Sequence, residues 1–124
     1  MVSYEVYEER DTVLRNPKYQ ILNSRKGSFY FRLCARNGEI VLTSVNYGSK
    51  PDCIDALARV KDQADFNSVE TKDETKKLFS FMVKTKDQQI VGYSENYTTK
   101  LGRGNGIMSV MKIICDAPAE DLTQ

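Results

Sequence analysis

The sequence contains no histidine. Histidine is the commonest general base near neutral pH and the commonest zinc ligand, so its absence excludes the hydrolases whose nucleophile a histidine activates. We predict that the protein is not an enzyme. We also predict no catalytic residue, no metal site and no cofactor.

Cysteine is scarce and irregularly spaced. Cys34, Cys53 and Cys115 are odd in number and include no CxxC pair, which is typical of buried reduced thiols and not of a disulfide framework. The residues after Met1 show neither the basic nor the apolar region of an export signal. We therefore expect a cytoplasmic protein.

Long apolar runs and an excess of one charge are also missing. The longest apolar runs have the length of a strand, so we expect no membrane span. Eighteen basic and seventeen acidic residues give a net charge of +1, and the basic residues are scattered. A general attraction to nucleic acid is therefore unsupported. The length of 124 residues suits a single domain covering residues 1–124.

The sequence does contain an internal repeat. Residues 29–50, FYFRLCARNGEIVLTSVNYGSK, recur without a gap as residues 79–100, FSFMVKTKDQQIVGYSENYTTK, at an offset of 50 positions. Each copy should form one supersecondary unit, within repeats at 18–65 and 66–117. The identical pairs are Phe29/Phe79, Phe31/Phe81, Ile40/Ile90, Val41/Val91, Ser44/Ser94, Asn46/Asn96, Tyr47/Tyr97, Lys50/Lys100 and, beyond the segment, Val60/Val110.

The first repeat predicts three strands followed by a helix. Residues 19–24, 29–33 and 39–45 have strand patterns, and Asn37-Gly38 favours a two-residue type I′ turn between the last two. Ser49 suits the N-cap of the helix. The helix should place one apolar stripe on the sheet: Cys53, Ala56, Leu57, Val60 and Ala64.

The second repeat predicts the same order with weaker turn signals. Residues 66–71 should form its first strand and residues 72–77 a charged connection, while Thr99 suits the helix N-cap. Residues 118–124 form either a polar tail or a short final strand. Residues 1–17 are an extension that holds a short strand or a short helix.

Three glycines lie near the start of the second helix. Gly102, Gly104 and Gly106 follow the spacing GxGxG, which is not that of a phosphate-binding loop. Because glycine weakens a helix by about 1 kcal/mol relative to alanine, we expect the regular helix to begin near Asn105. Gly106 would then let the helix approach the sheet.

The motifs resemble a known family. The pattern F-x-F-x-L, then N-G-E-I, then T-S-x-x-Y-x-S-K, with G-I-x-S-V in the second copy, is similar to the YegP-like family of small, mostly bacterial proteins of unknown function. The resemblance implies an α+β fold in which two tandem β3-α(-β) repeats share one antiparallel sheet. Both helices would pack on one face, with pseudo-two-fold symmetry and exchanged last strands. It implies no activity and no catalytic residues.

The best candidates for a binding site are residues that the repeat duplicates at equivalent strand ends. They could line one symmetric groove. The alternative is structural, because asparagine suits turns and tyrosine packs over a helix start. The candidates are Ser44, Asn46, Tyr47, Ser94, Asn96 and Tyr97.

A second candidate surface is the sheet face without helices, where Tyr30, Arg32, Met82 and Lys84 should lie. It could bind single-stranded nucleic acid or another subunit, or it could be solvated. Our leading hypothesis is a non-enzymatic binding or interaction module of unknown ligand, either a monomer or a homodimer. A weak single-stranded nucleic-acid binder is the alternative, and a small enzyme using serine or tyrosine with lysine comes third.

Overall fold

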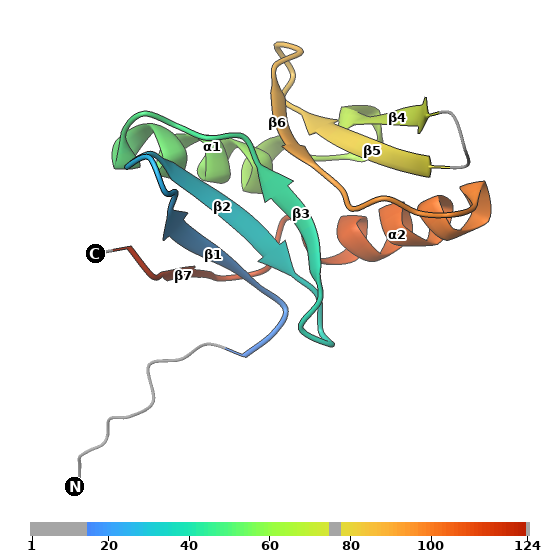
Figure 1. The fold of residues 1–124 in the computed structure, drawn as a ribbon, viewed down its shortest axis with the longest axis horizontal. Coiled ribbons are helices and arrows are strands. Elements are labelled where there is room, and N and C mark those ends of the chain that lie inside the picture. The colour runs from blue at the N-terminus through green and yellow to red at the C-terminus, as the bar shows by residue number, and fades with distance from the viewer. Residues whose placement is uncertain (1–14, 75–77, 124) are drawn as a thin grey trace, which may run out of the picture.

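The computed structural model describes residues 15–74 and 78–123 of the chain. The strand or short helix predicted at the N-terminus lies almost entirely outside these residues. Within them the predicted order of three strands and a helix occurs twice (Figure 1). The elements are β1(Lys18–Asn23), β2(Phe29–Cys34), β3(Ile40–Ser44), α1(Lys50–Gln63), the 3-10 helix η1(Phe66–Ser68), β4(Val69–Glu74), β5(Leu78–Lys84), β6(Ile90–Tyr93), α2(Lys100–Ile113) and β7(Ala119–Asp121).

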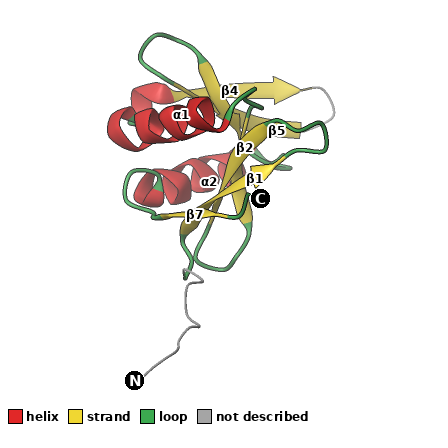
Figure 2. Ribbon diagram, turned by 90° about the vertical axis from the view of Figure 1, so that its left-hand side faces the viewer, coloured by secondary structure: helices red, strands yellow, loops and turns green. Residues whose placement is uncertain are grey.

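All seven of these strands belong to one sheet, in the order β4-β5-β6-β3-β2-β1-β7. Neighbouring strands are antiparallel except for β1 and β7, which are parallel. Both helices lie on the same side of this sheet (Figure 2). The α+β class and the shared sheet are thus as predicted.

The strand registers of the two repeats are equal once the offset of 50 is applied. Tyr19 lies opposite Leu33 in the first repeat, and Val69 lies opposite Val83 in the second. The register also shifts at the same place in both repeats, immediately after Leu33 and after Val83. A two-fold relation between the repeats would require such equalities.

The two repeats join where β3 pairs with β6. Thr43 lies opposite Tyr93, its own counterpart in the other repeat, and Ser44 lies opposite Gly92. A β carbon on Gly92 would sit 3.0 Å from the carbonyl oxygen of Thr43 and 3.3 Å from the side chain of Leu42. The close approach of the repeats therefore depends on this glycine.

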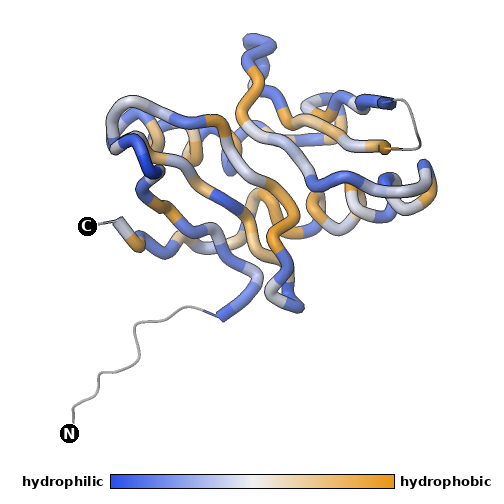
Figure 3. Tube along the Cα trace, viewed as in Figure 1, coloured by the Kyte–Doolittle hydropathy of each residue, from blue (hydrophilic) through white to orange (hydrophobic). Residues whose placement is uncertain are grey.

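The hydrophobic core combines side chains of both repeats. Most strands contain apolar stretches (Figure 3), and their buried residues pack with those of the two helices. Tyr19 is fully buried, and its hydroxyl donates to the carbonyl oxygen of Ile114 at the end of α2. The largest fully buried side chains come from β1, β2, β3, α1, β5 and α2: Tyr19, Phe31, Leu33, Leu42, Val60, Phe81, Val83, Val110 and Ile114.

Both helix starts are capped by the residues that the sequence indicates. Ser49 caps α1, and the Thr99 hydroxyl accepts a hydrogen bond of 2.9 Å from the Gly102 amide at the start of α2. The expectation that α2 begins near Asn105 is wrong, because the helix already begins at Lys100. The cap satisfies amides in the first turn, so glycine does not delay the helix.

Two details of the second repeat also differ from the prediction. The strand expected from residue 66 begins only at Val69, because Asp65 caps η1 by accepting from the Asn67 amide, while Ser68 accepts from the Asp65 amide. β4 then continues through residues 72–74, which were expected to form a connection.

The turn at Asn37-Gly38 is not of type I′. That type needs positive φ at both central residues, whereas only Gly38 has it here, at 88°. The Gly38 amide donates to the carbonyl of Ala35, and the Ala35 amide donates to the carbonyl of Glu39. The loop therefore has three residues, 36–38, and ends with Gly38 in the left-handed conformation. The second repeat builds the same loop, and Gln88 adopts a φ of 69° in place of the glycine.

The two edges of the sheet differ. The C-terminal segment is a strand, β7, which follows the second repeat and pairs with β1 of the first repeat. This is one half of the strand exchange that the resemblance implies. The other half is absent, because residues 64–68 between α1 and β4 contain only η1. Among the strands that the structure describes, β4 therefore lies at an edge of the sheet.

Candidate functional site

Two clefts of related construction lie at opposite ends of the boundary between the repeats. Each is formed by the second hairpin of one repeat together with the helix and the duplicated tyrosine of the other repeat. We call them the Tyr97 cleft, of about 690 Å³, and the Tyr47 cleft, of about 400 Å³. The former is large enough for a small ligand.

The Tyr97 cleft has a floor of helix backbone. Gly102 and Gly106 line it from α2, and the β2–β3 hairpin forms the opposite wall. A β carbon at Gly106 would sit only 2.2 Å from the hydroxyl oxygen of Tyr97. The remaining lining residues are mostly polar: Ala35, Arg36, Asn37, Glu39, Val41, Glu95, Tyr97, Asn105, Ser109, Lys112 and Ile113.

Tyr97 is held in place from both its backbone and its ring. Its amide and carbonyl form hydrogen bonds of 2.7 and 2.9 Å with Phe79 of β5, and its ring stacks on Phe81 with centroids 6.4 Å apart. The half-buried ring therefore presents its hydroxyl at a fixed point above Gly106.

The charges around the Tyr97 cleft are mixed. Burial raises the pKa of Tyr97 above its ordinary value, and the carboxylates of Glu95 and Glu39 raise it further. The phenol therefore stays protonated at neutral pH and acts as a hydrogen-bond donor. Arg36 and Lys112 line the same cleft, so it offers both carboxylates and cations to a ligand.

The Tyr47 cleft is smaller and has different lining residues. Ala56 occupies the position equivalent to Gly106, and Arg59 lines the cleft beside it. Burial raises the pKa of Tyr47, the nearby Cys53 raises it further, and Arg59 opposes them. Ala56 carries a methyl group on α1 where α2 has only the hydrogen of Gly106.

The predicted serines form part of the strand structure. The Ser44 hydroxyl accepts from the Phe31 amide at 2.8 Å, and the Ser94 hydroxyl accepts from the Phe81 amide at 2.9 Å. Each hydroxyl also donates to the carbonyl of the residue that follows it. Neither serine lines either cleft.

The other predicted residues are divided between the two ends of the molecule. Asn46 and Asn96 are exposed and line neither cleft, while Tyr47 and Tyr97 line different ones. The six candidates therefore do not meet in one groove. Sequence reasoning missed the hairpin and helix residues that complete the Tyr97 cleft, since they come together only through the strand order: Arg36, Glu39, Glu95, Asn105 and Lys112.

The face of the sheet without helices carries a row of side chains on neighbouring strands. Tyr93 lies opposite Met82 on one side and Thr43 on the other, and its side chain is 44% exposed. The cations of this face are engaged, because Lys84 pairs with Glu70 and Arg32 donates to Gln20 at 2.8 Å. Tyr93 is a candidate that the sequence analysis missed.

Thiols and carboxylates form no metal site in the described part of the chain, where no three potential ligands cluster. Burial raises the pKa of Cys53 to about 11, and Asp121 adds to this effect, so this thiol is a poor nucleophile at neutral pH. Cys34 is buried and Cys115 half-buried, both as free thiols.

Comparison with known proteins identifies the family. A domain of unknown function, DUF1508, matches residues 24–70 and again residues 76–121, in agreement with the repeat. The chain belongs to this family. The UPF0339 protein YegP of Yersinia pestis is 38% identical over 106 residues, which cover 85% of this chain and 95% of YegP. A UPF0339 protein from the ptx operon 5′ region of Stutzerimonas stutzeri is 36% identical over 100 residues, covering 80% and 90%.

Two solved structures are similar to this fold. The solution NMR structure of a UPF0339 protein from Shewanella oneidensis has a TM-score of 0.80 at 30% identity, covering 86% of this chain and 91% of its own. That of YegP from E. coli has a TM-score of 0.80 at 31% identity, covering 90% and 97%. Among the described residues, neither helix has the length and apolar character needed to cross a membrane.

Proposed function

We propose that the protein is a non-enzymatic binding module whose ligand site is the Tyr97 cleft. The observation that carries this proposal is the combination of a cavity of about 690 Å³, a backbone floor at Gly106 and a fixed phenol donor above it. A concave site with a few convergent polar groups is the usual form of a small-molecule site.

The charges of the cleft favour a small ligand that is itself zwitterionic. Glu39 and Glu95 suit an ammonium group, while Arg36 and Lys112 suit a carboxylate. An amino acid or a short peptide carries both groups on a small frame. The Tyr97 hydroxyl would donate to an oxygen of the ligand, since its raised pKa keeps the proton in place.

The same electrostatics argue against nucleophilic catalysis by this tyrosine. An activated nucleophile needs a lowered pKa or an adjacent base that accepts its proton. The two carboxylates near Tyr97 instead favour the protonated phenol. Turnover of a substrate that was abolished by a change at Ser44, Tyr47, Ser94 or Tyr97 would overturn the non-enzymatic assignment.

The test is an NMR titration of isotope-labelled protein with a panel of amino acids and dipeptides. Shifts should concentrate at the amides of Gly102, Asn105 and Gly106, which line the cleft, and Glu39→Gln should weaken them. Tyr47→Phe, which changes the other cleft, is the matched control and should leave the shifts unchanged. A panel that moves no amide of α2 would contradict the proposal.

A second candidate function rests on the exposed ring of Tyr93. It lies in a row with Met82 and Thr43 on the face without helices, where a base of a single strand could stack. Binding should weaken with salt and with the double change Arg32→Ala and Lys84→Ala. If no single-stranded oligonucleotide bound at low salt, this candidate would be removed.

A further inference from the structure

Within residues 15–74 and 78–123, β4 forms an edge of the sheet and pairs only with β5. Five of its six residues are exposed. The β4–β5 register runs from Val69 to Glu74 without a bulge, and the strand contains no proline. Sheet edges are commonly protected by bulges, prolines or charged side chains, and residues 69–74 carry only the charged side chains.

The backbone groups that face outward follow from the ladder. Phe79 and Phe81 of β5 direct their amides and carbonyls toward β6 and the segment after it. Since bonded and non-bonded pairs alternate in an antiparallel ladder, the residues opposite them, Asp73 and Thr71, direct their backbone groups away from β5. These groups are available to another strand.

The corresponding edge of the first repeat already holds a strand. The Tyr19 amide donates to the carbonyl of Pro118 at 2.7 Å, and the Leu122 amide donates to the carbonyl of Ile21 at 2.9 Å. Ile21 is the counterpart of Thr71 at the offset of 50. An edge of this construction therefore accepts a strand while a helix covers one face.

The sequence of β4 is complementary to itself in charge. If two copies pair antiparallel about Thr71, then Glu70 of each copy lies opposite Lys72 of the other. Pairing about Lys72 would oppose two lysines and place Glu70 against Glu74, and pairing about Asp73 would oppose two aspartates. Only the first register combines opposite charges with a neutral centre.

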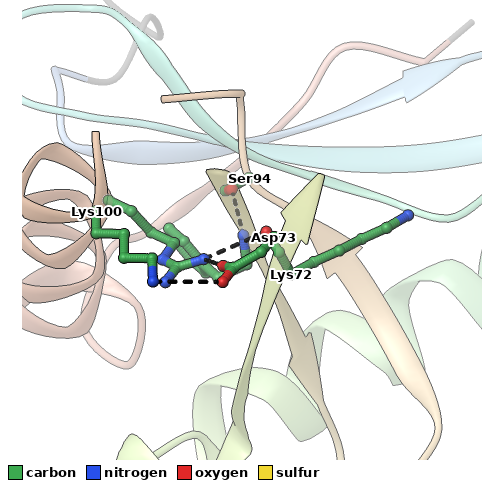
Figure 4. Close-up of polar contacts among 6 residues, drawn as sticks. Lys72, Asp73, Ser94 and Lys100 are labelled. Carbon is green, nitrogen blue, oxygen red and sulfur yellow. Dashed lines mark hydrogen bonds and ion pairs between the residues drawn. The ribbon is translucent and has the colours of Figure 1, made fainter. Parts of the chain in front are cut away.

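Asp73 does not disturb this register. On the helix side of the strand its carboxylate accepts a hydrogen bond from Arg103, and Lys100 lies 3.8 Å away (Figure 4). The Lys72 side chain points to the other side. The hydrogen bond from Arg103 lowers the pKa of Asp73, so this charge is compensated within its own chain.

We propose that β4 pairs antiparallel with β4 of a second copy, centred on Thr71, so that one sheet continues through a homodimer. Strands of six residues bury much less than the roughly 1,000 Å² of a stable interface. The dimer is therefore weak and forms at high protein concentration. It adds a self-interaction to the binding function and does not depend on either cleft.

The decisive test uses charge reversal and mixing of the full-length protein. Lys72→Glu opposes Glu70 with glutamate, and Glu70→Lys opposes Lys72 with lysine, so each variant alone should associate about tenfold more weakly. Mixed in equal amounts, the two variants place glutamates only against lysines. Sedimentation equilibrium should then show a heterodimer at least as strong as the wild-type dimer.

Two controls make the result specific to the edge. Lys86→Glu makes the same charge change in the β5–β6 turn and should leave association unchanged. Thr71→Pro removes an outward amide, which an edge strand tolerates, and should abolish association while amide dispersion stays native. A wild-type protein that is monomeric at about 1 mM, with no association in the mixture, would overturn the proposal.

Hydrogen exchange distinguishes a second copy of the protein from another segment of the same chain as the partner of β4. In the proposed dimer, the Thr71 and Asp73 amides become protected only as protein concentration rises. Protection at every concentration would mean that another segment of the same chain covers the edge, and it would overturn the second copy as occupant. Association that persists in both Thr71→Pro and Lys72→Glu would place the interface elsewhere and would also overturn it.

Discussion

Substitution of Gly106 by alanine tests how the Tyr97 cleft is built. In most exposed helix positions, replacing glycine with alanine stabilises a protein, because alanine loses less backbone entropy on folding. At Gly106 the new methyl group would meet the Tyr97 hydroxyl oxygen at 2.2 Å and its Cζ at 2.5 Å. Gly106→Ala therefore combines a favourable gain in helix propensity with an unfavourable steric clash against Tyr97.

The two effects can be compared in magnitude. The gain in helix propensity is about 1 kcal/mol. Forcing a methyl group into a packed contact typically costs about 1 to 3 kcal/mol. The tyrosine has little freedom to yield, because Phe79 holds its backbone and Phe81 stacks on its ring. We expect Gly106→Ala to lower the free energy of unfolding by up to about 2 kcal/mol.

The effect of Gly106→Ala on stability should change sign when the Tyr97 side chain is removed. In a Tyr97→Ala protein the colliding atoms are absent, so adding Gly106→Ala should raise the free energy of unfolding by about 1 kcal/mol. Gly104→Ala is the matched control in the same helix, since no atom lies within 4 Å of its added β carbon. It should stabilise the wild-type protein by the same amount.

Urea unfolding followed by circular dichroism measures all four variants against the wild type. A double-mutant cycle then gives the coupling between positions 97 and 106 directly. If Gly106→Ala stabilised the wild type as much as Gly104→Ala does, Tyr97 would not be held against the helix. The described geometry of the cleft would then be wrong.

Four further outcomes follow from other contacts. Ser44→Ala removes the acceptor of a buried strand amide and should cost about 1 to 3 kcal/mol in urea unfolding, with faster exchange of that amide. Gln88→Gly should raise the free energy of unfolding by about 0.5 to 1 kcal/mol, because glycine adopts the left-handed conformation of this position without strain. Gly38→Ala should lower it by about 1 kcal/mol for the converse reason, and a change of the same sign in both variants would contradict this explanation. Hydrogen bonds from Lys50 and Thr123 lower the pKa of Asp121 to about 2, so its carboxylate stabilises the fold above its unfolded pKa of about 3.9 and stops doing so as the pH falls toward 2. Asp121→Asn should therefore cost under about 1 kcal/mol at pH 7, since the pair with Lys50 is half-exposed, and the difference from wild type should vanish near pH 2. Residues 1–65 and 66–124, expressed separately, should each lack dispersed amide resonances because the core is shared; a folded half would show that the repeats are independent.

Local signals in the sequence were sufficient for most of the fold. The repeat fixed which strands correspond, and Ser49 and Thr99 marked both helix starts. The start of α2 was predicted too late, because average helix propensity does not include the hydrogen bond by which Thr99 caps the first turn. The turn at Gly38 was misread for a related reason, since Asn-Gly serves several loop types and the register decides among them.

The candidate site was harder to predict than the fold. Tyr97 was identified through its duplication, but its neighbours Glu39 and Lys112 belong to different repeats. Their proximity depends on β3 and β6 meeting at the centre of the sheet, which is a long-range pairing. No periodicity or spacing encodes it. Tyr93 was missed because alternation assigns a side chain to a face without indicating how exposed it is.

Each cleft combines a hairpin from one repeat with a helix from the other, so the two clefts are built from equivalent but separately encoded residues. In a dimer of identical single repeats, any substitution would appear in both clefts at once. Covalent fusion removes that restriction, so the chain can carry Gly106 in one cleft and Ala56 in the other, or Ser109 in one and Arg59 in the other. Duplication within one chain thus allows one cleft to be enlarged while its counterpart is filled.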